Sequence, residues 1–202
     1  MITKIFAVVF TVAYICVSIW LCRKFRFDVK SLALGAIAIA LTCILACIYI
    51  PLPTGASITC CSWVPLMLLA IIYDYRLAII SGFVCGIITI FVVPGWSIVH
   101  WAQFFLEYVP LFSCMGYAGI LGYEKKGRLI LAIALAVVLR MTAQILSGAI
   151  FFGAYAWEGW GAWAYSLVYH FTSKIPEGII SALVLLALPL DRLAKIAKGG
   201  AR

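Results

Sequence analysis

The sequence predicts an all-α fold, a polytopic bundle of membrane-spanning helices. Of the 202 residues, 66% are hydrophobic and only 11% are charged, which is far more apolar than a soluble domain of this length requires. The apolar residues form long runs, separated by short segments that hold most of the charges. Runs of about 17 to 25 apolar residues are long enough to cross a bilayer as a helix. Together these observations exclude a soluble globular domain.

The first apolar run, Ile5–Cys22, is about the shortest length that can span a bilayer. A secretory signal peptide is the alternative interpretation, but no small-x-small cleavage site follows the run. We therefore predict a retained transmembrane helix. Together with the basic loop that follows, this helix makes up a first unit, residues 1–30. The bases of the loop are Arg23, Lys24, Arg26 and Lys30.

The second predicted span, Ser31–Ile50, carries small residues on one face. Ala36 and Ala40 are four residues apart, a spacing that places them on the same side of a helix. Small residues at this spacing allow another helix to approach closely in a membrane, either within the chain or on a partner subunit. The loop Pro51–Ser57 holds no charge and is predicted to be an extracellular turn or a re-entrant loop.

Five further spans are predicted after the uncharged loop. Asp74 and Arg76 mark a tight turn between the third and the fourth span, and Pro94–Gly95 ends the fourth. The fifth contains Pro110, the position at which we expect that helix to bend if it bends at all. The predicted spans are Ile58–Tyr73, Leu77–Val93, His100–Tyr123, Leu129–Phe152 and Ala164–Leu188.

The distribution of basic residues predicts the orientation of the chain. Most of the 15 Lys and Arg residues lie in three short loops and in the C-terminal tail. Cytoplasmic loops of membrane proteins are rich in Lys and Arg, so we expect these segments, including the tail at 191–202, to be cytoplasmic and the N-terminus to lie outside. The loops at 51–57, 94–99 and 153–162 hold no base. Short basic clusters between apolar runs indicate a lipid surface rather than a nucleic acid.

The fifth predicted span is polar along one face. His100, Gln103 and Glu107 are spaced i, i+3 and i+7, so they share a helix face, while the other faces are apolar. A carboxylate inside a membrane is costly unless a partner or a ligand compensates its charge. Glu107 is therefore the first candidate for a ligand-binding residue. The alternative is a polar group that bonds to a neighbouring helix.

Two more polar residues are expected at the depth of Glu107. Glu107, Gln144 and His170 each lie several residues below the outer end of their predicted helix. At a rise of about 1.5 Å per residue, this places all three roughly 10–12 Å below the outer surface of the membrane. Polar groups buried at one depth of a bundle usually meet one another or a shared ligand. We therefore predict a site between the last three spans that is open to the outside and closed below.

The other intramembrane charges also have a structural interpretation. Arg140 lies one turn deeper than Gln144, where an arginine more often braces backbone carbonyls than binds a substrate. Lys174 and Glu177 are three residues apart and either pair within the helix or face the site, and Pro176 is expected to kink that helix. The 8 Cys residues form no CxxC motif and are interpreted as packing residues, so no metal site or cofactor is predicted.

Four segments of the chain resemble those of a known family. They are PLPTGASIT at 51–59, HWAQFFLEYVPLF at 100–112, LRMTAQILSGAIFFGAYA at 139–156 and WAYSLVYHFTSKIPE at 163–177. In this order they resemble the signature segments of the thiamine-specific S-components of energy-coupling-factor (ECF) transporters. The resemblance extends from about Ser31 to Leu188 and implies a substrate-binding membrane domain at 31–190 with six helices. The span Ile5–Cys22 is then an additional helix.

The resemblance implies the substrate-binding subunit of a vitamin importer, which binds thiamine at an outward-facing site in the bacterial plasma membrane. ATP is then hydrolysed by partners, two ATPases that act with a transmembrane coupling subunit, and the chain itself is not an enzyme. Ala36 and Ala40 match the face that docks to the coupling subunit. By position, Glu107 matches the acid that faces the thiazolium cation, and the matching aromatic residues are Tyr108, Phe152 and Tyr165.

Two matching positions depart from the family pattern. Gln144 stands where the family usually has His, and His170 where it usually has Asn, so one carboxamide and one imidazole remain on exchanged helices. This exchange is compatible with thiamine or with a related ring, such as hydroxymethylpyrimidine or a pyridoxal-type vitamin. At position 174 the family usually has an apolar residue, whereas this chain has Lys174. An ammonium group repels a cation, so Lys174 favours a related, uncharged or anionic ring over thiamine.

Two other classes of function are alternatives to transport. An intramembrane enzyme would use His170 with Ser147 or Glu177, but nothing in the sequence places an oxyanion site beside them. A purely structural membrane subunit does not explain why three polar residues are expected at one depth. The substrate-binding subunit is therefore the preferred prediction.

Overall fold

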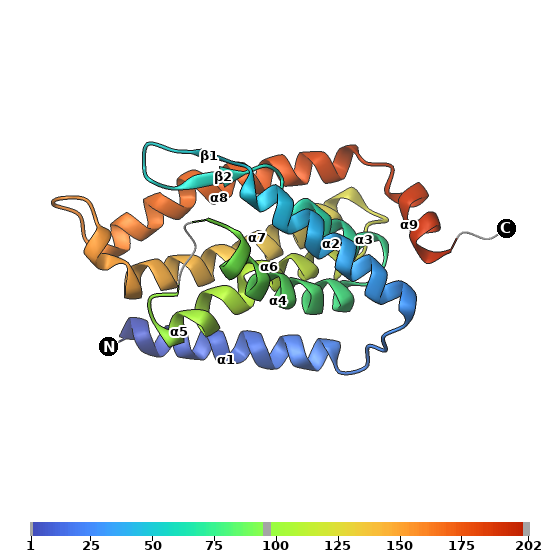
Figure 1. Cartoon of the computed structure of the whole chain (residues 1–202), viewed down its shortest axis with the longest axis horizontal. Coiled ribbons are helices and arrows are strands. Elements are labelled where there is room, and N and C mark those ends of the chain that lie inside the picture. The colour runs from blue at the N-terminus through green and yellow to red at the C-terminus, as the bar shows by residue number, and fades with distance from the viewer. Residues whose placement is uncertain (1, 95–97, 200–202) are drawn as a thin grey trace.

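The computed structural model describes residues 2–94 and 98–199, and it confirms the all-α membrane fold. Four of its helices are long and apolar enough to cross a membrane: α1 (Ile2–Cys22), α2 (Val29–Cys47), α4 (Tyr75–Val92) and α7 (Lys126–Phe151). None of these four segments contains proline, so their backbone hydrogen bonds continue without interruption. The long helices run roughly along the long axis of the molecule (Figure 1).

Two acidic residues mark the starts of helices. The Asp28 side chain accepts a hydrogen bond from the backbone N–H of Ser31 (2.8 Å), and the Ser31 hydroxyl accepts one from the backbone N–H of Asp28 (2.9 Å), a complete capping box for α2. The hydrogen bond from Ser31 lowers the pKa of Asp28. Asp74 caps α4 by accepting from the backbone N–H of Arg76 (2.7 Å). The turn predicted at Asp74 and Arg76 is therefore the start of this helix.

The chain between α2 and α4 differs from the predicted third span. Instead of one helix over Ile58–Tyr73, it forms an antiparallel hairpin of β1 (Tyr49–Pro51) and β2 (Ser57–Thr59), and then the short helix α3 (Val64–Ile72). The strands contain β-branched Ile and Thr, which favour extended backbone. Gly55 in the connecting turn has a φ of +83°, a conformation that most residues rarely adopt. The uncharged loop predicted at 51–57 is thus the tip of a hairpin.

The fifth predicted span consists of four short consecutive segments, called the composite segment below. They are α5 (Trp101–Gln103), the π-helical η1 (Phe104–Tyr108), α6 (Val109–Ser113) and the 3-10 helical η2 (Cys114–Gly119). Pro110 has no N–H to donate to the carbonyl one turn earlier. The turn before it is wider, and the N–H of Val109 donates to the carbonyl of Phe104. The bend predicted at Pro110 is therefore a change of helix type.

The C-terminal part holds two helices after α7. A single 3-10 turn, η3 (Gly153–Tyr155), leads to α8 (Ala162–Ala187), which contains Pro176 and begins two residues before the predicted seventh span. The helix α9 (Leu190–Lys198) lies in the segment for which the sequence predicted only a basic tail. Its Ala194 and Ala197 are buried, and it packs against α3, so contacts with a distant part of the chain stabilise it. The predicted break at Pro94–Gly95 and the end of the tail at Arg202 fall partly outside the described residues.

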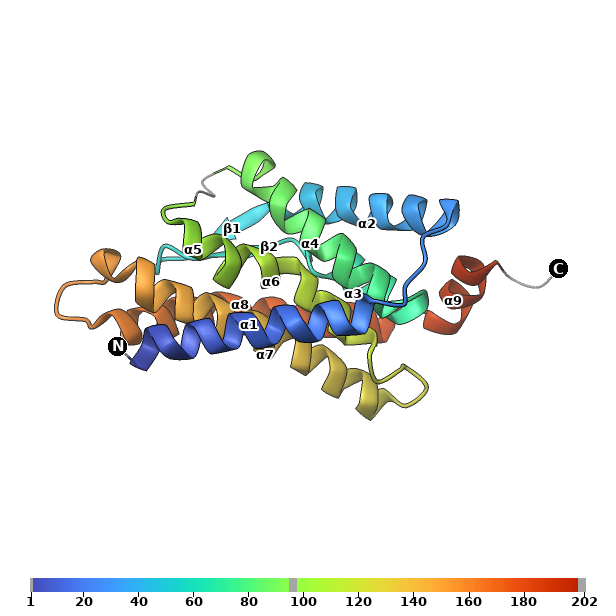
Figure 2. The same ribbon diagram turned by 90° about the horizontal axis from the view of Figure 1, so that it is seen from below.

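The two ends of the bundle differ in their content of basic residues. The basic loop between α1 and α2 lies at the same end as α9, while the β1–β2 hairpin and the connection between α7 and α8 lie at the other end (Figure 1). Figure 2, the view from below, shows the same separation along the long axis. The basic segments and these two connections, which hold no Lys or Arg, thus lie at opposite ends, as a membrane protein that obeys the positive-inside rule requires.

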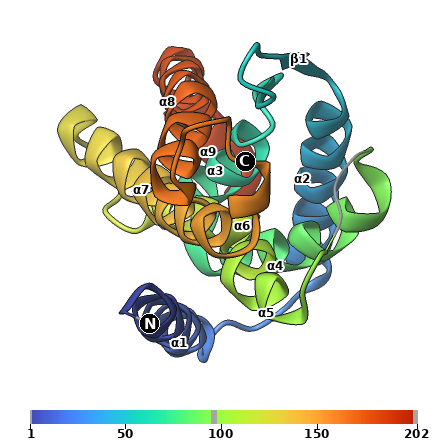
Figure 3. The ribbon, with the colours of Figure 1, turned by 90° about the vertical axis from the view of Figure 1, so that its left-hand side faces the viewer.

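Helix α1 lies on the outside of the bundle (Figure 3), and most of its residues are exposed. Two side-chain hydrogen bonds, one turn apart, attach it to the composite segment. Tyr14 Oη and Ser113 Oγ are 2.6 Å apart, and Ser18 Oγ and Tyr117 Oη are 2.9 Å apart. Hydrogen bonds between helices hold a membrane bundle together where lipid supplies no hydrophobic driving force.

Candidate ligand-binding site

A cavity of about 240 Å³ lies between the composite segment, α7, α8 and the strand β2. Each of these elements contributes polar and aromatic side chains to its wall. The cavity brings together residues that are more than sixty positions apart in the sequence, because three helices and the hairpin meet there. Of the residues selected in the sequence, Gln103, Glu107, Tyr108, Gln144, Phe152, Tyr165, His170 and Lys174 line it.

Glu107 projects from the π-helical turn and holds two hydrogen bonds from the protein. Its Oε2 accepts from Gln103 Nε2 (3.0 Å) and from Ser147 Oγ of α7 (2.6 Å). Gln103 in turn accepts at its Oε1 from the backbone N–H of Val99 (2.9 Å), so its orientation is set by the chain before α5. Hydrogen-bond donors of this kind stabilise a carboxylate that is removed from bulk water. Glu107 therefore presents a negative charge to the cavity.

Gln144 and His170 stand on α7 and α8, where these helices come close together. Gly148 permits the approach, because a side chain there would collide with Ser166 of α8. Both polar residues are buried, and within 2–94 and 98–199 no hydrogen-bond partner is found for Gln144 Oε1 or His170 Nδ1. Buried polar atoms without a protein partner usually bond to water or to a ligand. The two atoms are therefore available for the recognition of a polar ring.

Aromatic side chains form a further part of the wall. Tyr108 comes from η1, Phe152 from the end of α7, and Tyr165 and Tyr169 from successive turns of α8, with the last two ring centroids 5.6 Å apart. The Tyr169 hydroxyl donates to the carbonyl of Gly55 (3.2 Å) and so connects α8 with the tip of the hairpin. Aromatic faces beside a carboxylate are suited to hold a cationic or a planar ring.

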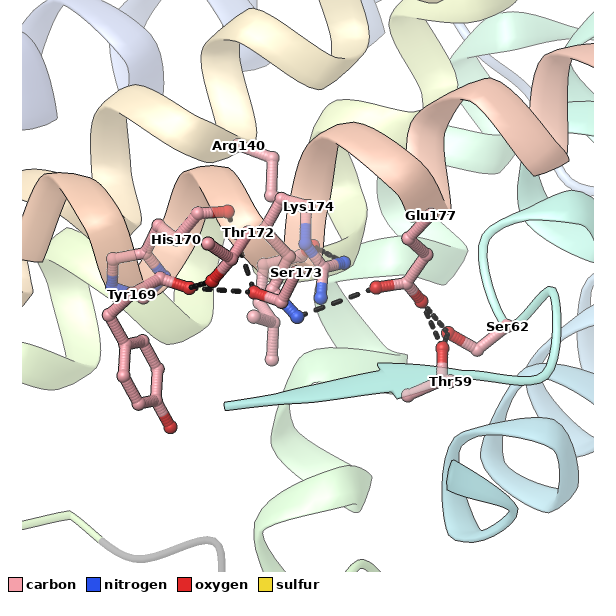
Figure 4. Close-up of polar contacts among 10 residues, drawn as sticks. Thr59, Ser62, Arg140, Tyr169, His170, Thr172, Ser173, Lys174 and Glu177 are labelled. Atoms are coloured by element: carbon pink, nitrogen blue, oxygen red, sulfur yellow. Dashed lines mark hydrogen bonds and ion pairs between the residues drawn. The ribbon is translucent and has the colours of Figure 1, made fainter. Parts of the chain in front are cut away.

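A charged pair lies further along α8. Lys174 Nζ is 3.4 Å from Glu177 Oε2, the pairing within the helix that the sequence left open (Figure 4). The other carboxylate oxygen of Glu177 accepts hydrogen bonds from Thr59 of β2 and from Ser62. Glu177 therefore connects α8 to the end of the hairpin, while Lys174 belongs to the cavity wall.

Arg140 braces the composite segment from behind the cavity. Its Nη1 donates to the carbonyl of Leu111 at 2.5 Å. Its guanidinium carbon lies 4.6 Å from the ring centroid of Trp63 and 4.8 Å from that of Phe112, so the cation is held between two aromatic rings. Arg140 is 2% exposed and is not among the residues that line the cavity. Arg140 therefore braces a backbone carbonyl, the more common role that its position in the sequence predicts.

Besides Arg140 and Glu177, three more of the selected residues do not line the cavity. His100 is exposed and caps α5 by accepting from the backbone N–H of Ala102 (3.1 Å), and its ring stacks on Phe151 with centroids 5.3 Å apart. It therefore does not continue the polar face of Gln103 and Glu107 into the cavity. Ala36 and Ala40 lie on an exposed face of α2, so the described part of the chain does not cover them.

The cavity also contains residues that the sequence analysis did not assign to it, notably Ser57, Thr59, Tyr169 and Ser173. Ser147, which donates to Glu107, was considered only for a hydrolytic mechanism. A spacing signal was present, since Ser147 is three residues after Gln144 and Ser173 three after His170, on the same helix faces. No comparable spacing in the sequence indicated that Ser57 and Thr59 of the hairpin line the cavity.

The described residues contain no group of three or more His, Cys, Asp or Glu side chains that could hold a metal ion. The cysteines are all free thiols, and the buried Cys43 and Cys85 have their sulfur atoms 3.9 Å apart between α2 and α4. The candidate site is therefore a cavity that offers charge, hydrogen bonds and aromatic faces to an organic ligand.

Comparison with known proteins gives concordant matches. Residues 32–197 match the family model described as thiamine transporter protein (Thia_YuaJ). The thiamine transporter ThiT of Bacillus subtilis is 30% identical over 152 residues, which cover 69% of this chain and 78% of that protein. ThiT of Lacticaseibacillus paracasei is 28% identical over 168 residues, covering 75% and 81%. The solved structure of ThiT from Listeria monocytogenes has the same fold, with a TM-score of 0.69 at 24% identity over 83% of this chain and 96% of that one.

Proposed function

Because this chain belongs to the thiamine transporter protein (YuaJ) family, we propose that it binds thiamine in the cavity between the composite segment, α7 and α8. The observation that carries this proposal is Glu107, a carboxylate that points into an aromatic-walled cavity and is held by two donors. The thiazolium ring of thiamine is a fixed cation. A fixed cation is attracted strongly by an oriented carboxylate and by aromatic faces in surroundings of low dielectric constant.

Gln144 and His170 supply the recognition of the second ring in this proposal. The aminopyrimidine of thiamine carries both donors and acceptors, and a carboxamide can match both kinds. Among the described residues that line the cavity, His170 Nδ1 and Gln144 Oε1 are the buried side-chain polar atoms that lack a hydrogen-bond partner, so a ligand that bonds to them removes an energetic cost. A related ring, such as hydroxymethylpyrimidine or a pyridoxal-type vitamin, remains the second candidate because Lys174 faces the same cavity.

A binding titration of the detergent-purified protein tests the ligand directly. Trp157 lies 5.0 Å, between ring centroids, from the cavity residue Tyr165, so its fluorescence is expected to report occupancy. We expect saturable quenching by thiamine at nanomolar to low-micromolar concentration, and much weaker responses to pyridoxal and to hydroxymethylpyrimidine. A response to one of these two rings without a response to thiamine would reject thiamine as the ligand.

We further propose that the chain is the substrate-binding subunit of an ECF importer, with its site open to the outside and its basic loops and C-terminus in the cytoplasm. Partner chains, a membrane coupling subunit and two ATPases, would supply the energy. The exposed, small-residue face at Ala36 and Ala40 of α2 suits a closely packed helix of the coupling subunit. The Ser147 hydroxyl donates to Glu107, whereas the hydrolytic alternative paired it with His170.

Enlarging the small-residue face is expected to separate binding from transport. The double change Ala36→Leu and Ala40→Leu puts two branched side chains where another backbone must approach, so we expect uptake to be lost while the thiamine Kd changes less than about twofold. Radiolabelled thiamine uptake in cells and titration of the purified variant measure the two quantities. The matched control is Ala134→Leu, an exposed alanine on α7. Uptake that survives in the double variant would exclude this face as the docking surface.

A further inference from the structure

The cation of the Lys174–Glu177 pair faces the cavity, and its counterion does not. The side chain of Lys174 is 11% exposed and lines the cavity, whereas that of Glu177 is 1% exposed and is not part of the lining. The two charged atoms are 3.4 Å apart. A ligand in the cavity therefore meets the ammonium first, with the carboxylate behind it.

Glu177 is held in this position from the side opposite to Lys174. Thr59 and Ser62 both donate to its Oε1, and Lys174 approaches its Oε2 (Figure 4). A carboxylate with three donors cannot turn toward the cavity without losing bonds that are costly to leave unmade. The orientation of the pair, with its positive end toward the ligand, is therefore fixed by Thr59 of the hairpin and by Ser62.

Among residues 2–94 and 98–199, the other charges that act on Lys174 are Glu107 and Arg140. Glu107 has its own donors, Gln103 and Ser147, and shares no hydrogen-bond partner with Lys174. Arg140 lies behind the wall, between two aromatic rings. The cavity wall thus carries the negative carboxylate of Glu107 on η1 and the positive ammonium of Lys174 on α8, each with its own hydrogen-bond partners.

We propose that the Lys174–Glu177 pair makes Lys174 a specificity-determining residue, which lowers the preference for a cationic ligand and directs the cationic ring toward Glu107. The inference rests on the proposed function, because it assumes that thiamine enters this cavity. An elementary charge at about 8 Å, in surroundings of effective dielectric constant about 20, changes a binding constant by roughly tenfold or more. The uncharged part of the ligand, rich in hydrogen-bond acceptors, then lies beside the ammonium donors of Lys174.

A charge cycle tests this inference. The probes are thiamine and its neutral analogue in which a thiophene replaces the thiazolium, and the quantity measured is the Kd of the analogue divided by the Kd of thiamine. We expect Lys174→Met to raise this ratio about tenfold and Glu177→Gln to lower it about tenfold, because each leaves one charge of the pair uncompensated. The double variant carries neither charge, so its ratio should lie between those of the single variants and exceed that of the unmodified protein by no more than about threefold, because the ammonium is the nearer charge of the pair.

The ratio cancels losses that both ligands share, such as a hydrogen bond to the hydroxyethyl group or a small change in cavity shape. Lys195→Met on the exposed surface of α9 changes the net charge by the same amount far from the cavity and should leave the ratio unchanged. If Lys174→Met does not fold, Lys174→Gln makes the same change of charge. A ratio that stays constant across the single variants while thiamine still binds would overturn this inference alone. Failure of the unmodified protein to bind thiamine would instead reject the proposed function.

Discussion

Replacing Glu107 by glutamine should weaken thiamine binding by about a hundredfold, because removing one member of a desolvated, hydrogen-bonded charge pair typically costs a few kcal/mol. The change keeps the size of the side chain and one oxygen that can accept from Gln103 and Ser147. It removes only the negative charge that compensates the thiazolium cation. The loss should therefore appear for thiamine and be small, less than about threefold, for the neutral thiophene analogue.

Titration of both ligands against the purified variant measures this difference. Ser147→Ala is the matched control, because it removes one donor to Glu107 while leaving the carboxylate in place. We expect that control to change the thiamine Kd by only about tenfold, because the carboxylate keeps its charge and its donor Gln103, and one lost hydrogen bond to a charged group costs roughly 1.5 kcal/mol at the lower end of its range. Equal losses for thiamine and the neutral analogue in Glu107→Gln would show that the carboxylate acts through shape rather than charge.

The membrane helices could be predicted closely because burial in lipid requires long apolar runs. The sixth span, predicted at Leu129–Phe152, is α7 at Lys126–Phe151, and the fourth, predicted at Leu77–Val93, is α4 at Tyr75–Val92. In both cases the helix starts earlier than predicted, because its first turn includes polar residues at the membrane surface. Apolar composition identifies the part of a helix in the lipid better than it identifies the ends.

The hairpin and the composite segment could not be predicted in the same way. An apolar run such as Ile58–Tyr73 is compatible with a strand, a helix or both, because hydrophobicity does not distinguish them over short lengths. What distinguishes them here are contacts with α8, namely Thr59 with Glu177 and Tyr169 with Gly55. Residues more than a hundred positions apart make these contacts, so no local pattern contains the information.

The depth of the candidate-site residues in the membrane could be predicted, because each residue of a helix adds a constant rise along the helix axis. A constant rise along each helix was enough to place Glu107, Gln144 and His170 at one depth, and the structure brings all three to one cavity. The start of each helix was harder to predict. Because α5 begins at Trp101, His100 is its extended N-cap residue and does not share the helix face of Gln103 and Glu107. Whether the residues of the cavity wall bind thiamine stays a prediction until the titrations above are made.

The largest effect on stability is expected at Arg140. Its buried guanidinium donates to the carbonyl of Leu111 and lies close to the rings of Trp63 and Phe112. It also supplies positive charge to the carboxylates of Glu177 and Glu107. Arg140→Met removes all three contributions and leaves those carboxylates less compensated. We expect a loss of about 3–5 kcal/mol in the free energy of unfolding, because uncompensated buried charge is costly.

Thermal unfolding in detergent measures this loss, which corresponds to a fall in Tm of roughly 10 °C for a chain of this size. Arg140→Lys keeps the charge but lacks the planar guanidinium that fits between two rings, so we expect it to recover only about half of the difference. Arg128→Met, at the exposed start of α7, is the matched control and should shift Tm by no more than about 2 °C. If Arg140→Met unfolds at the same temperature as this control, the composite segment keeps its π-helical turn, and Glu107 its position, without the brace from α7.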